Sequence, residues 1–320
     1  MLVEDRVRAE RKLAQVGYYR LSGFWYPCRR LRLDKNGQPV ISPVNNKPER
    51  LDDFENGTSF NAIFELYLFD KKLRQLMLDA IERIEVHVRS VIANEIGYYD
   101  PLAYQNPNFI NQTTRRQQQS WNNWLARQNE KVTQSKEDCI NWHRQNNKAM
   151  PFWVVVEAWD FGTMSMYFGI LKRSYQNKIC KRLGISDPTV LKNWLQEINT
   201  LRNRCAHHTR IWNQCSNNPL PILEKEPYLA NLKLDNDAKK KIYGLISVIW
   251  FLITKIGPNS KWIIKIADLI DSKPKLPGCF YKSMGFPNEN GFPRDKFGLT
   301  PRETYSDIPL PLYYTCFEDL

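Results

Sequence analysis

The longest regular pattern of apolar positions along the chain lies between residues 60 and 96. Apolar side chains recur there at steps of three and four, which is the spacing of one face of an α-helix. These positions are Phe60, Ile63, Phe64, Tyr67, Leu73, Met77, Ala80, Ile81, Ile84, Val88, Val91 and Ile92. Thr58 or Ser59 can cap the start of this helix, and Gly97 can end it. At 1.5 Å per residue it would be roughly 55 Å long, which predicts the spine of a helical bundle.

Shorter helical patterns occur on both sides of this spine, each with a recognisable boundary signal. They are residues 2–16 before Gly17, a helix from Asp187-Pro188 to about Cys205, residues 238–256 before Gly257-Pro258, and a helix after Ser260 that carries Trp262, Ile263, Ile266 and Ile270. A cap residue or proline at the start and a glycine at the end are typical of real helix boundaries. The pattern therefore predicts several helices that pack on the spine.

Two adjacent segments differ sharply in polarity. Residues 113–147 are strongly polar, and their few apolar positions, such as Trp121 and Trp124, form only a thin stripe. This pattern predicts one long helix or a helical hairpin that projects from the bundle or caps it. Residues 150–172 are apolar enough to be buried, and Gly162 is the predicted break within them.

The remaining segments are irregular. Residues 34–57 are rich in proline and asparagine and are predicted to form a loop or a small hairpin, and residues 214–237 a loop. No strong strand pattern occurs outside residues 31–45, so the predicted fold class is all-α. The predicted organisation is a single helical domain at 1–271, a polar helical insertion at 113–148 within it, and an irregular C-terminal tail at 272–320 that packs on the domain.

The charge balance narrows the classes of partner. Formal net charge is +12, and a field of this size favours a polyanion, either nucleic acid or a membrane surface. A solvated basic surface without a partner is the alternative. The chain also holds 10 Trp, 15 Tyr and 15 Phe, which either fill the core or stack on unpaired bases. The longest apolar run, at 242–256, is too short to span a bilayer comfortably, so we expect no membrane partner.

Cysteine usage and the N-terminus bear on location. The seven cysteines are scattered and form no C-x-x-C pair, which indicates free thiols in a reducing compartment. The first twelve residues are highly charged and unlike a signal peptide, so a cytoplasmic location is expected. The chain has no phosphate loop, no dinucleotide fingerprint, no H-E-x-x-H and no nucleophile elbow, which argues against those enzyme classes.

The stretch LRNRCAHHTRIWN, at 201–213, is the strongest candidate for chemistry. Two of the four histidines stand side by side there, close behind two arginines. An imidazole exchanges protons near neutral pH, and a guanidinium holds a phosphate through two parallel hydrogen bonds. RNA carries its own nucleophile, the 2′-hydroxyl. A base, an acid and a cationic clamp therefore suffice to cut RNA without a metal or other cofactor.

Spacing alone does not show that these residues work together. Arg202 and His207 are five residues apart, about 140° around a helix axis, so they do not converge within one helix. They could converge if the helix ends near His207, or if two copies of the chain face each other. Asn203, one turn before His207, could hold the imidazole in one tautomer.

Two other interpretations remain open at this point. An Arg and a His near a helix C-terminus stabilise the macrodipole, and spacing alone favours this structural role. Cys205, His207 and His208 could instead suggest a metal site, although no second ligand group stands at a useful spacing, so none is predicted.

Four blocks of the sequence resemble a known family. They are GYYRLSGFWYPCR (17–29), FELYLFDKKLRQLMLDAIERIEVHVRS (64–90), PFWVVVEAWDFGTMS (151–165) and LRNRCAHHTRIWN (201–213), with MGFP (284–287) as a weaker fifth. In this order they resemble the Abi-like family of bacterial abortive-infection proteins, the AbiD/AbiF group, which is assigned to the HEPN superfamily. No block is specific alone, but their joint occurrence is.

The resemblance implies a HEPN-like helical bundle, commonly a homodimer, and a metal-independent endoribonuclease with an R-x(4–6)-H motif. That motif maps onto Arg202, Asn203 and His207. By resemblance, Arg202 positions the phosphate, His207 acts as general base or acid, and Asn203 orients the imidazole ring. The products would carry a cyclic phosphate and a 5′-hydroxyl. The protein would act as a toxin in anti-phage defence, with an RNA or protein antitoxin as a further partner.

The alternative function is an RNA-binding protein that forms a stable ribonucleoprotein with a structured RNA, in which the motif binds rather than cuts. The surplus positive charge and the mixture of aromatic and arginine residues at 17–33 motivate it. Candidate RNA-binding residues are Tyr19, Arg20, Arg29, Arg30, Arg204, His208 and Arg210. A scaffold that binds only proteins is a third possibility.

Overall fold

The computed structural model describes residues 1–44, 46–216 and 218–300. Within these residues the fold is all-α, as the sequence predicts, with one small sheet. The helices are α1 (Arg6–Val16), α2 (Tyr18–Trp25), α3 (Phe60–Gly97), α4 (Arg115–Gln134), α5 (Asp138–Gln145), α6 (Phe152–Val155), α7 (Phe161–Ile170), α8 (Arg173–Arg182), α9 (Pro188–Ala206), α10 (Pro227–Leu232), α11 (Ile242–Ile256) and α12 (Trp262–Asp271). None of these helices combines the length and apolarity that crossing a membrane requires.

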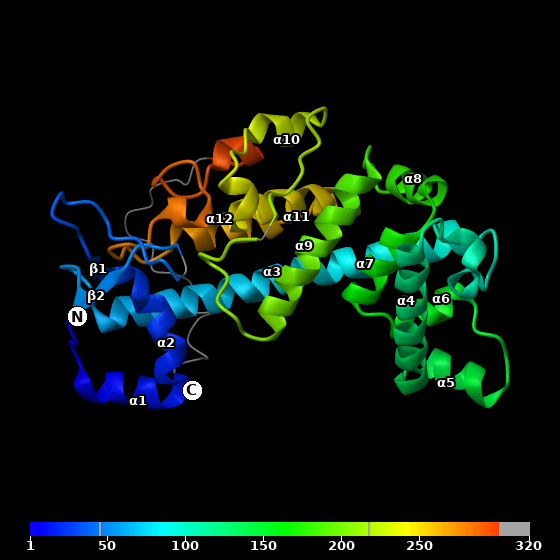
Figure 1. Cartoon of the computed structure of the whole chain (residues 1–320), viewed down its shortest axis with the longest axis horizontal. Helices are drawn as coiled ribbons and strands as arrows, with labels where there is room; N and C mark the ends of the chain where they lie inside the picture. The colour runs from blue at the N-terminus through cyan, green and yellow to red at the C-terminus, as the bar shows by residue number, and fades with distance from the viewer. Residues whose placement is uncertain (45, 217, 301–320) are drawn as a thin grey trace.

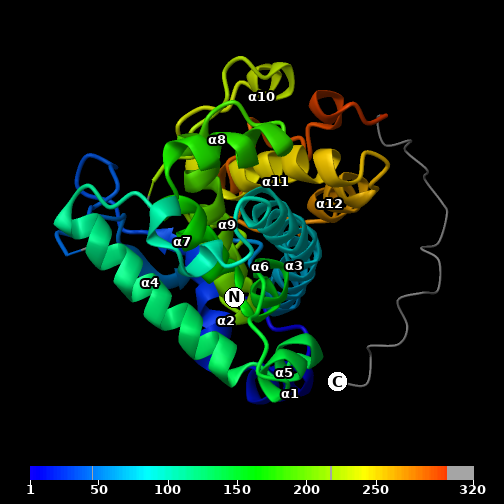
Figure 2. The same cartoon turned by 90° about the vertical axis from the view of Figure 1, so that its right-hand side faces the viewer.

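Helix α3 is the predicted spine. It runs through the length of the molecule, with α1, α2 and the sheet near its start and α4 to α8 near its end (Figure 1). Ser59 caps it, because its hydroxyl accepts a hydrogen bond from the backbone N–H of Ala62 at 3.2 Å. Gly97 is the last helical residue rather than the stop. Seen along its axis, α3 lies among α6, α9, α11 and α12 (Figure 2).

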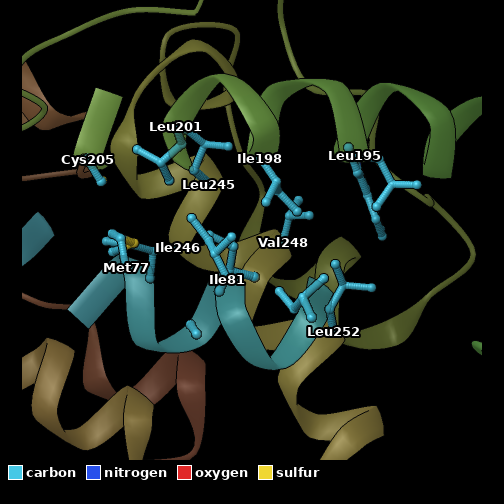
Figure 3. Packing of buried hydrophobic residues seen from close by; sticks show 14 of the residues in the cluster. Met77, Ile81, Leu195, Ile198, Leu201, Cys205, Leu245, Ile246, Val248 and Leu252 are labelled. Atoms are coloured by element: carbon cyan, nitrogen blue, oxygen red, sulfur yellow. The ribbon is translucent and has the colours of Figure 1, made fainter. Parts of the chain in front are cut away.

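One hydrophobic contact joins α3, α9 and α11. Met77 and Ile81 of α3 face Ile198 and Leu201 of α9, and side chains of α11 complete the cluster (Figure 3). Each of these four side chains is at most 3% exposed. Burial of such side chains contributes about 1.5–3 kcal/mol each, so this cluster fixes α9 firmly on the spine.

The predicted polar segment is a helical hairpin of α4 and α5. Thr114 and Gln117 form a capping box that starts α4, and each side chain bonds the other residue's backbone N–H. The indole N–H of Trp124 donates to the Thr163 carbonyl at 2.9 Å, which anchors α4 on α7. The thin apolar stripe is therefore enough to attach this polar helix along one side.

Several boundaries differ from the prediction. The sequence indicated no helix at α2 or α8, and α10 lies inside the predicted loop at 214–237. The break in the apolar segment falls before Asp160, not at Gly162, which lies inside α7. The reason is that the Asp160 carboxylate accepts the Thr163 N–H at 2.7 Å and so caps a new helix.

The segment at 34–57 forms a hairpin whose paired strands lie at its two ends. Strand β1 (Arg29–Leu31) pairs antiparallel with β2 (Arg50–Phe54), and isolated bridges continue the pairing toward the tip. The strands therefore flank the predicted range of 31–45 rather than fill it. The hairpin sits beside α1 and α2 at the start of α3 (Figure 1).

Residues 272–300 cover α11 and α12 with two short 3₁₀ turns. Phe286 and Phe292 are buried there, and Arg294 pairs with Asp268 at 2.6 Å and Asp271 at 2.9 Å. The remainder of the predicted tail, 301–320, lies outside the described residues. The described part thus joins the same hydrophobic cluster as the helices.

One close backbone approach holds this segment against the N-terminal part of the chain. Gly278 has a φ of +73°, and a Cβ there would lie 1.9 Å from the Pro27 carbonyl oxygen. Beside it, the buried thiols of Cys28 and Cys279 lie 3.7 Å apart. Only glycine fits this contact, because any side chain would force the two backbones apart.

We therefore expect Gly278→Ala to lower the free energy of unfolding by about 2–4 kcal/mol. Gly37→Ala is the matched control, since Gly37 has a φ of +75° but nothing within 4 Å of its added Cβ. It should show only the backbone strain of about 1 kcal/mol. Chemical denaturation measures both, and equal losses would contradict the assigned contact.

Candidate functional site

Helix α9 carries the arginine–histidine motif to its C-terminal end. Asp187 starts the helix, since its carboxylate accepts the Thr189 N–H at 2.7 Å, and Pro188 takes the first turn. The helix ends at Ala206, and His207 is its C-cap residue. His208 then has a φ of +57°, in the left-handed region, so the chain turns sharply away from the axis.

A buried carboxylate of the spine helix α3 binds the backbone of the turn after α9. Asp70 is fully buried and accepts the backbone N–H groups of Ile211 at 2.9 Å and Trp212 at 2.8 Å. Its other oxygen forms an ion pair with Arg74, one turn further along α3. Burial raises the pKa of Asp70, against the opposing effect of Arg74 and the two N–H groups. The buried Asp70–Arg74 pair therefore fixes the backbone of residues 211 and 212, which follows the motif.

Helix α2 borders the same turn. Arg20 donates to the carbonyl oxygen of His208 at 2.8 Å. The guanidinium of Arg210 lies 5.9 Å from the centre of the Phe24 ring, and an added Cβ at Gly23 would meet it at 3.1 Å. The first and last of the four sequence blocks are therefore neighbours in space, although they are almost 190 residues apart.

Within one chain, no hydrogen bond joins the Arg202 guanidinium to the His207 imidazole among the described residues. Arg202 is half-buried on the side of α9 that faces α3, and its Nη1 donates to the Asn203 side-chain oxygen at 3.3 Å. His207 is exposed on another side, and its imidazole has no hydrogen-bond partner among residues 1–44, 46–216 and 218–300. Only its backbone N–H bonds Asn203, at the carbonyl oxygen, 2.9 Å away. In the single chain, Asn203 thus contacts Arg202 and not the His207 ring.

Arg202 has an acidic neighbour on the spine. Burial raises the pKa of Glu85, and the nearby charges of Arg89 and Arg202 oppose that rise. Arg89 itself donates to the carbonyl oxygens of Val156 at 3.2 Å and Trp159 at 2.9 Å. Glu85 therefore places a carboxylate near the guanidinium that the motif assigns to phosphate binding.

A second polar cluster joins α4 to the start of α7, and its Asp160 lies near enough to Glu85 for the two charges to interact. Asp160 pairs with Lys131 at 2.8 Å and Arg127 at 3.4 Å, besides capping α7 through Thr163. Although burial raises the pKa of Asp160, the hydrogen bonds from Lys131 and Thr163 hold it well below its ordinary value. The cluster therefore ties the polar hairpin to the apolar segment.

Asp160→Asn should keep the helix cap but lose the ion pairs, so we expect a loss of stability at pH 7. Because the folded pKa is depressed, the stabilisation by Asp160 is present above its unfolded pKa near 3.9 and is lost as pH falls toward the folded pKa. The difference in unfolding free energy between wild type and variant should then shrink below about pH 4. A difference that persists unchanged to pH 2.5 would contradict this assignment. Asp160→Ala, which also lacks the cap, should lose about 1 kcal/mol more.

The candidate RNA-binding residues fall into two groups. Tyr19, Arg20 and Arg30 are exposed, and Tyr19 is 90% exposed. Arg29, by contrast, pairs with Asp52 at 2.7 Å, and Arg204 contacts the Cys215 carbonyl at 3.4 Å. Arg20 also has a partner, the His208 carbonyl oxygen at 2.8 Å, so of the first group Tyr19 and Arg30 are the ones that present their polar groups to solvent. His208 is exposed and Arg210 half-buried on the turn after α9.

The geometry also separates the three residues of the metal interpretation. Cys205 is 1% exposed and faces the core, whereas His207 and His208 lie outside. Burial raises the pKa of the Cys205 thiol to about 12, so it is protonated at neutral pH. In the described parts of the chain, no three His, Cys, Asp or Glu side chains group in a way that could hold a metal ion.

Comparison with known families agrees with the arrangement of these blocks. The family model described as Abi-like protein matches residues 11–213. The chain belongs to the Abi-like family. No curated protein and no solved structure matches the chain. In this Abi-like protein the matched region runs from α1 through the spine to the turn after α9, and it ends at Asn213, directly after Trp212.

Sequence reasoning missed Asp70 and Arg74, which hold that turn in this Abi-like protein. A signal was available, because Asp70 lies on the same helical face as Leu66, Leu73 and Met77, all of them apolar. An acid on a buried face, with an arginine four residues later, indicates a buried ion pair. The partner of that pair, the backbone at 211–212, could not be read from the spacing.

Proposed function

We propose that this Abi-like protein is a HEPN-type, metal-independent endoribonuclease that acts as a toxin in abortive infection. The observation that carries the proposal is the R-N-x-x-x-H motif at the end of α9, where a buried carboxylate of the spine fixes the following turn. An exposed imidazole on a rigid turn can reach a substrate, and rigid support is what a catalytic group needs. Family membership and the net charge of +12 agree with an RNA-directed defence role.

The chemistry requires only groups that the chain and RNA supply. His207 would accept the proton of a 2′-hydroxyl, whose oxygen then attacks the adjacent phosphorus. The bond from phosphorus to the 5′-oxygen breaks, and the leaving oxygen takes a proton from the His207 imidazolium to become a 5′-hydroxyl, which returns His207 to its neutral form. Arg202 would neutralise the charge on the phosphoryl oxygens in the transition state. One fragment keeps a 2′,3′-cyclic phosphate, and no oxidation or reduction takes place.

A complete site would need two copies of the chain. Within one chain Arg202 bonds the Asn203 side chain, and no hydrogen bond joins it to the His207 ring among the described residues. In a two-fold dimer, Arg202 of one protomer can face His207 of the other, which gives two identical sites. Asn203 would then be positioned by the same Arg202 that it contacts in the single chain. An RNA or protein antitoxin could silence the protein by covering this interface.

The direct test is incubation of the purified protein with a labelled single-stranded RNA in excess chelator. We expect fragments that end in a cyclic phosphate and a 5′-hydroxyl, which phosphatase and kinase treatment identify. RNA that stays intact at high enzyme concentration, in the dimeric state, would contradict the proposal.

The second candidate function is stable RNA binding without cleavage. It is favoured by the bond between Arg20 and the His208 carbonyl, which leaves an arginine and a histidine side by side at the surface. The protein would then elute together with an uncleaved, structured RNA. Its affinity should fall with salt, with a slope near −0.7 per phosphate neutralised on a single strand. A protein that elutes free of nucleic acid and binds RNA independently of salt would exclude this function.

A further inference from the structure

Three tyrosines around α2 are unusually exposed. Tyr18 is 55% exposed, Tyr19 90% and Tyr26 48%. Together with Arg29 they line a groove of about 280 Å³, which we call the α2 groove. A larger hollow of about 480 Å³ between α1 and the hairpin continues it and shares Tyr18 and Arg29 as lining residues. Rings this open gain little from packing within the chain, so their exposure needs another explanation.

The rings are held in place but not covered. Tyr18 meets the Trp25 ring at 5.2 Å with an interplanar angle of 68°, and Trp25 is only 4% exposed. Tyr19 contacts Tyr18 edge to face at 5.5 Å and 86°. Such contacts fix the orientation of a ring while a face of Tyr19 stays open to solvent. The groove is thus a pre-formed aromatic surface that rests on the buried Trp25 ring.

Arg29 lines the groove, and further arginines of the hairpin and of α2 lie near it. The Arg50 guanidinium lies 5.8 Å from the centre of the Tyr26 ring, and Arg30 is exposed on the neighbouring strand. Arg29 is partly neutralised by Asp52, which is the one acid bonded to these arginines among the described residues. At the other end, Arg20 reaches the His208 carbonyl. A polyanion is the partner that this line of positive charge fits.

We propose that the α2 groove binds an unpaired strand of RNA and guides it to His207. The tyrosine faces would stack on successive bases, and Arg20 and Arg50 would contact the phosphates between them. Base faces are available for stacking only when they are not stacked within a duplex, so the groove selects single strands. The inference rests on the proposed function and names its substrate as unpaired RNA.

The test uses the full chain with Arg202→Ala and His207→Ala in every sample, so that bound RNA stays intact. Fluorescence anisotropy measures its affinity for a labelled 12-nucleotide single strand and for the same strand paired with its complement. Tyr19→Ala with Tyr26→Ala should weaken binding of the single strand at least about tenfold. Tyr19→Phe should bind like the parent, because stacking needs the ring and not the hydroxyl. Tyr98→Ala is the matched control, since Tyr98 is 86% exposed but caps the far end of α3.

The outcomes separate the groove from the proposed function. Unchanged affinity in the tyrosine double variant, or equal affinity of the parent for duplex and single strand, would overturn the inference. A change in solution mass without a change in RNA affinity would also overturn it, because the groove would then hold a second copy of this chain. Loss of affinity specific to the groove tyrosines supports it. That result would support RNA binding in the groove even if the wild-type protein cut no RNA. If the wild-type protein cuts RNA but the tyrosine double variant keeps its affinity, the proposed function is supported and the groove is not the binding site.

Discussion

Asp70→Ala should lower the free energy of unfolding by about 3–5 kcal/mol, because it leaves Arg74 buried without its partner. It also removes the acceptor of the Ile211 and Trp212 N–H groups, so the turn after α9 loses its anchor. Chemical denaturation of the purified protein measures the loss. Nuclease activity of the variant, assayed well below its denaturation midpoint, should fall as well, since the anchored turn follows His207 directly.

A matched control lies on the same helix. Asp79 and Arg83 form an i,i+4 ion pair at 2.8 Å, but both side chains are more than 40% exposed. Asp79→Ala should therefore cost no more than about 0.5 kcal/mol. The loss of unfolding free energy in Asp70→Asn should lie between the losses in Asp70→Ala and Asp79→Ala, because the asparagine side-chain oxygen can still accept the N–H groups of the turn. Equal losses for Asp70→Ala and Asp79→Ala would show that the buried pair does not anchor the fold.

The second large effect concerns the composite site. Arg202→Ala and His207→Ala should each reduce cleavage by about 10²-fold or more, since each removes one required group from both sites of a dimer. A heterodimer of the two variants keeps one intact site, with Arg202 from one protomer and His207 from the other. We expect it to recover about half of the wild-type activity. The heterodimer can be produced with two different tags and purified through both.

Absence of recovery in the doubly tagged heterodimer would contradict the arrangement across a dimer and place both residues in one chain. His208→Ala serves as the control for the assignment within the motif. Its backbone carbonyl, rather than its ring, contacts Arg20, so the substitution keeps that bond. We expect its cleavage rate to stay within a few-fold of wild type, which would distinguish His207 as the acting histidine.

The spine helix could be predicted from the sequence because its signal is long and local. The periodicity of α3 extends over ten turns, and Ser59 caps it as expected. Helix α2 is eight residues long and contains Gly23 and three large aromatic rings in addition to Tyr18, a composition that does not favour a helix. Packing of Leu21, Phe24 and Trp25 on the spine determines it, and that packing is not visible in the local sequence.

The polar helix α8 was missed for a related reason. Only Gln176, Ile179 and Cys180 are buried in it, so the apolar stripe is too narrow to recognise. The α7 boundary depended on the side chain of Asp160, which caps the helix, and not on the flexibility of Gly162. In neither case is a long apolar period present to mark the helix.

The candidate site also combines features that the local sequence shows with contacts between distant residues that it does not show. Composition and motif predict Arg202, Asn203 and His207 as site residues, a prediction that the cleavage experiments test, but they do not place these residues in space. That α9 ends at Ala206, with His207 as its C-cap, is accompanied by a left-handed residue, His208, in a position where no glycine marks the stop. The support from Asp70 joins residues 141 positions apart, and no spacing rule reaches that far. The sequence therefore offers candidate residues for the site but not the contacts that support them.

The central claim is that Arg202 and His207 cut RNA, and the rate of cleavage of one defined single-stranded RNA tests it most directly. Wild-type protein and the Arg202→Ala, His207→Ala double variant are compared in excess chelator, at equal concentration and with equal thermal stability confirmed beforehand. The wild type should release fragments with cyclic-phosphate ends, and the double variant should be slower by about 10²–10⁴-fold. Equal rates for the two proteins would contradict the claim.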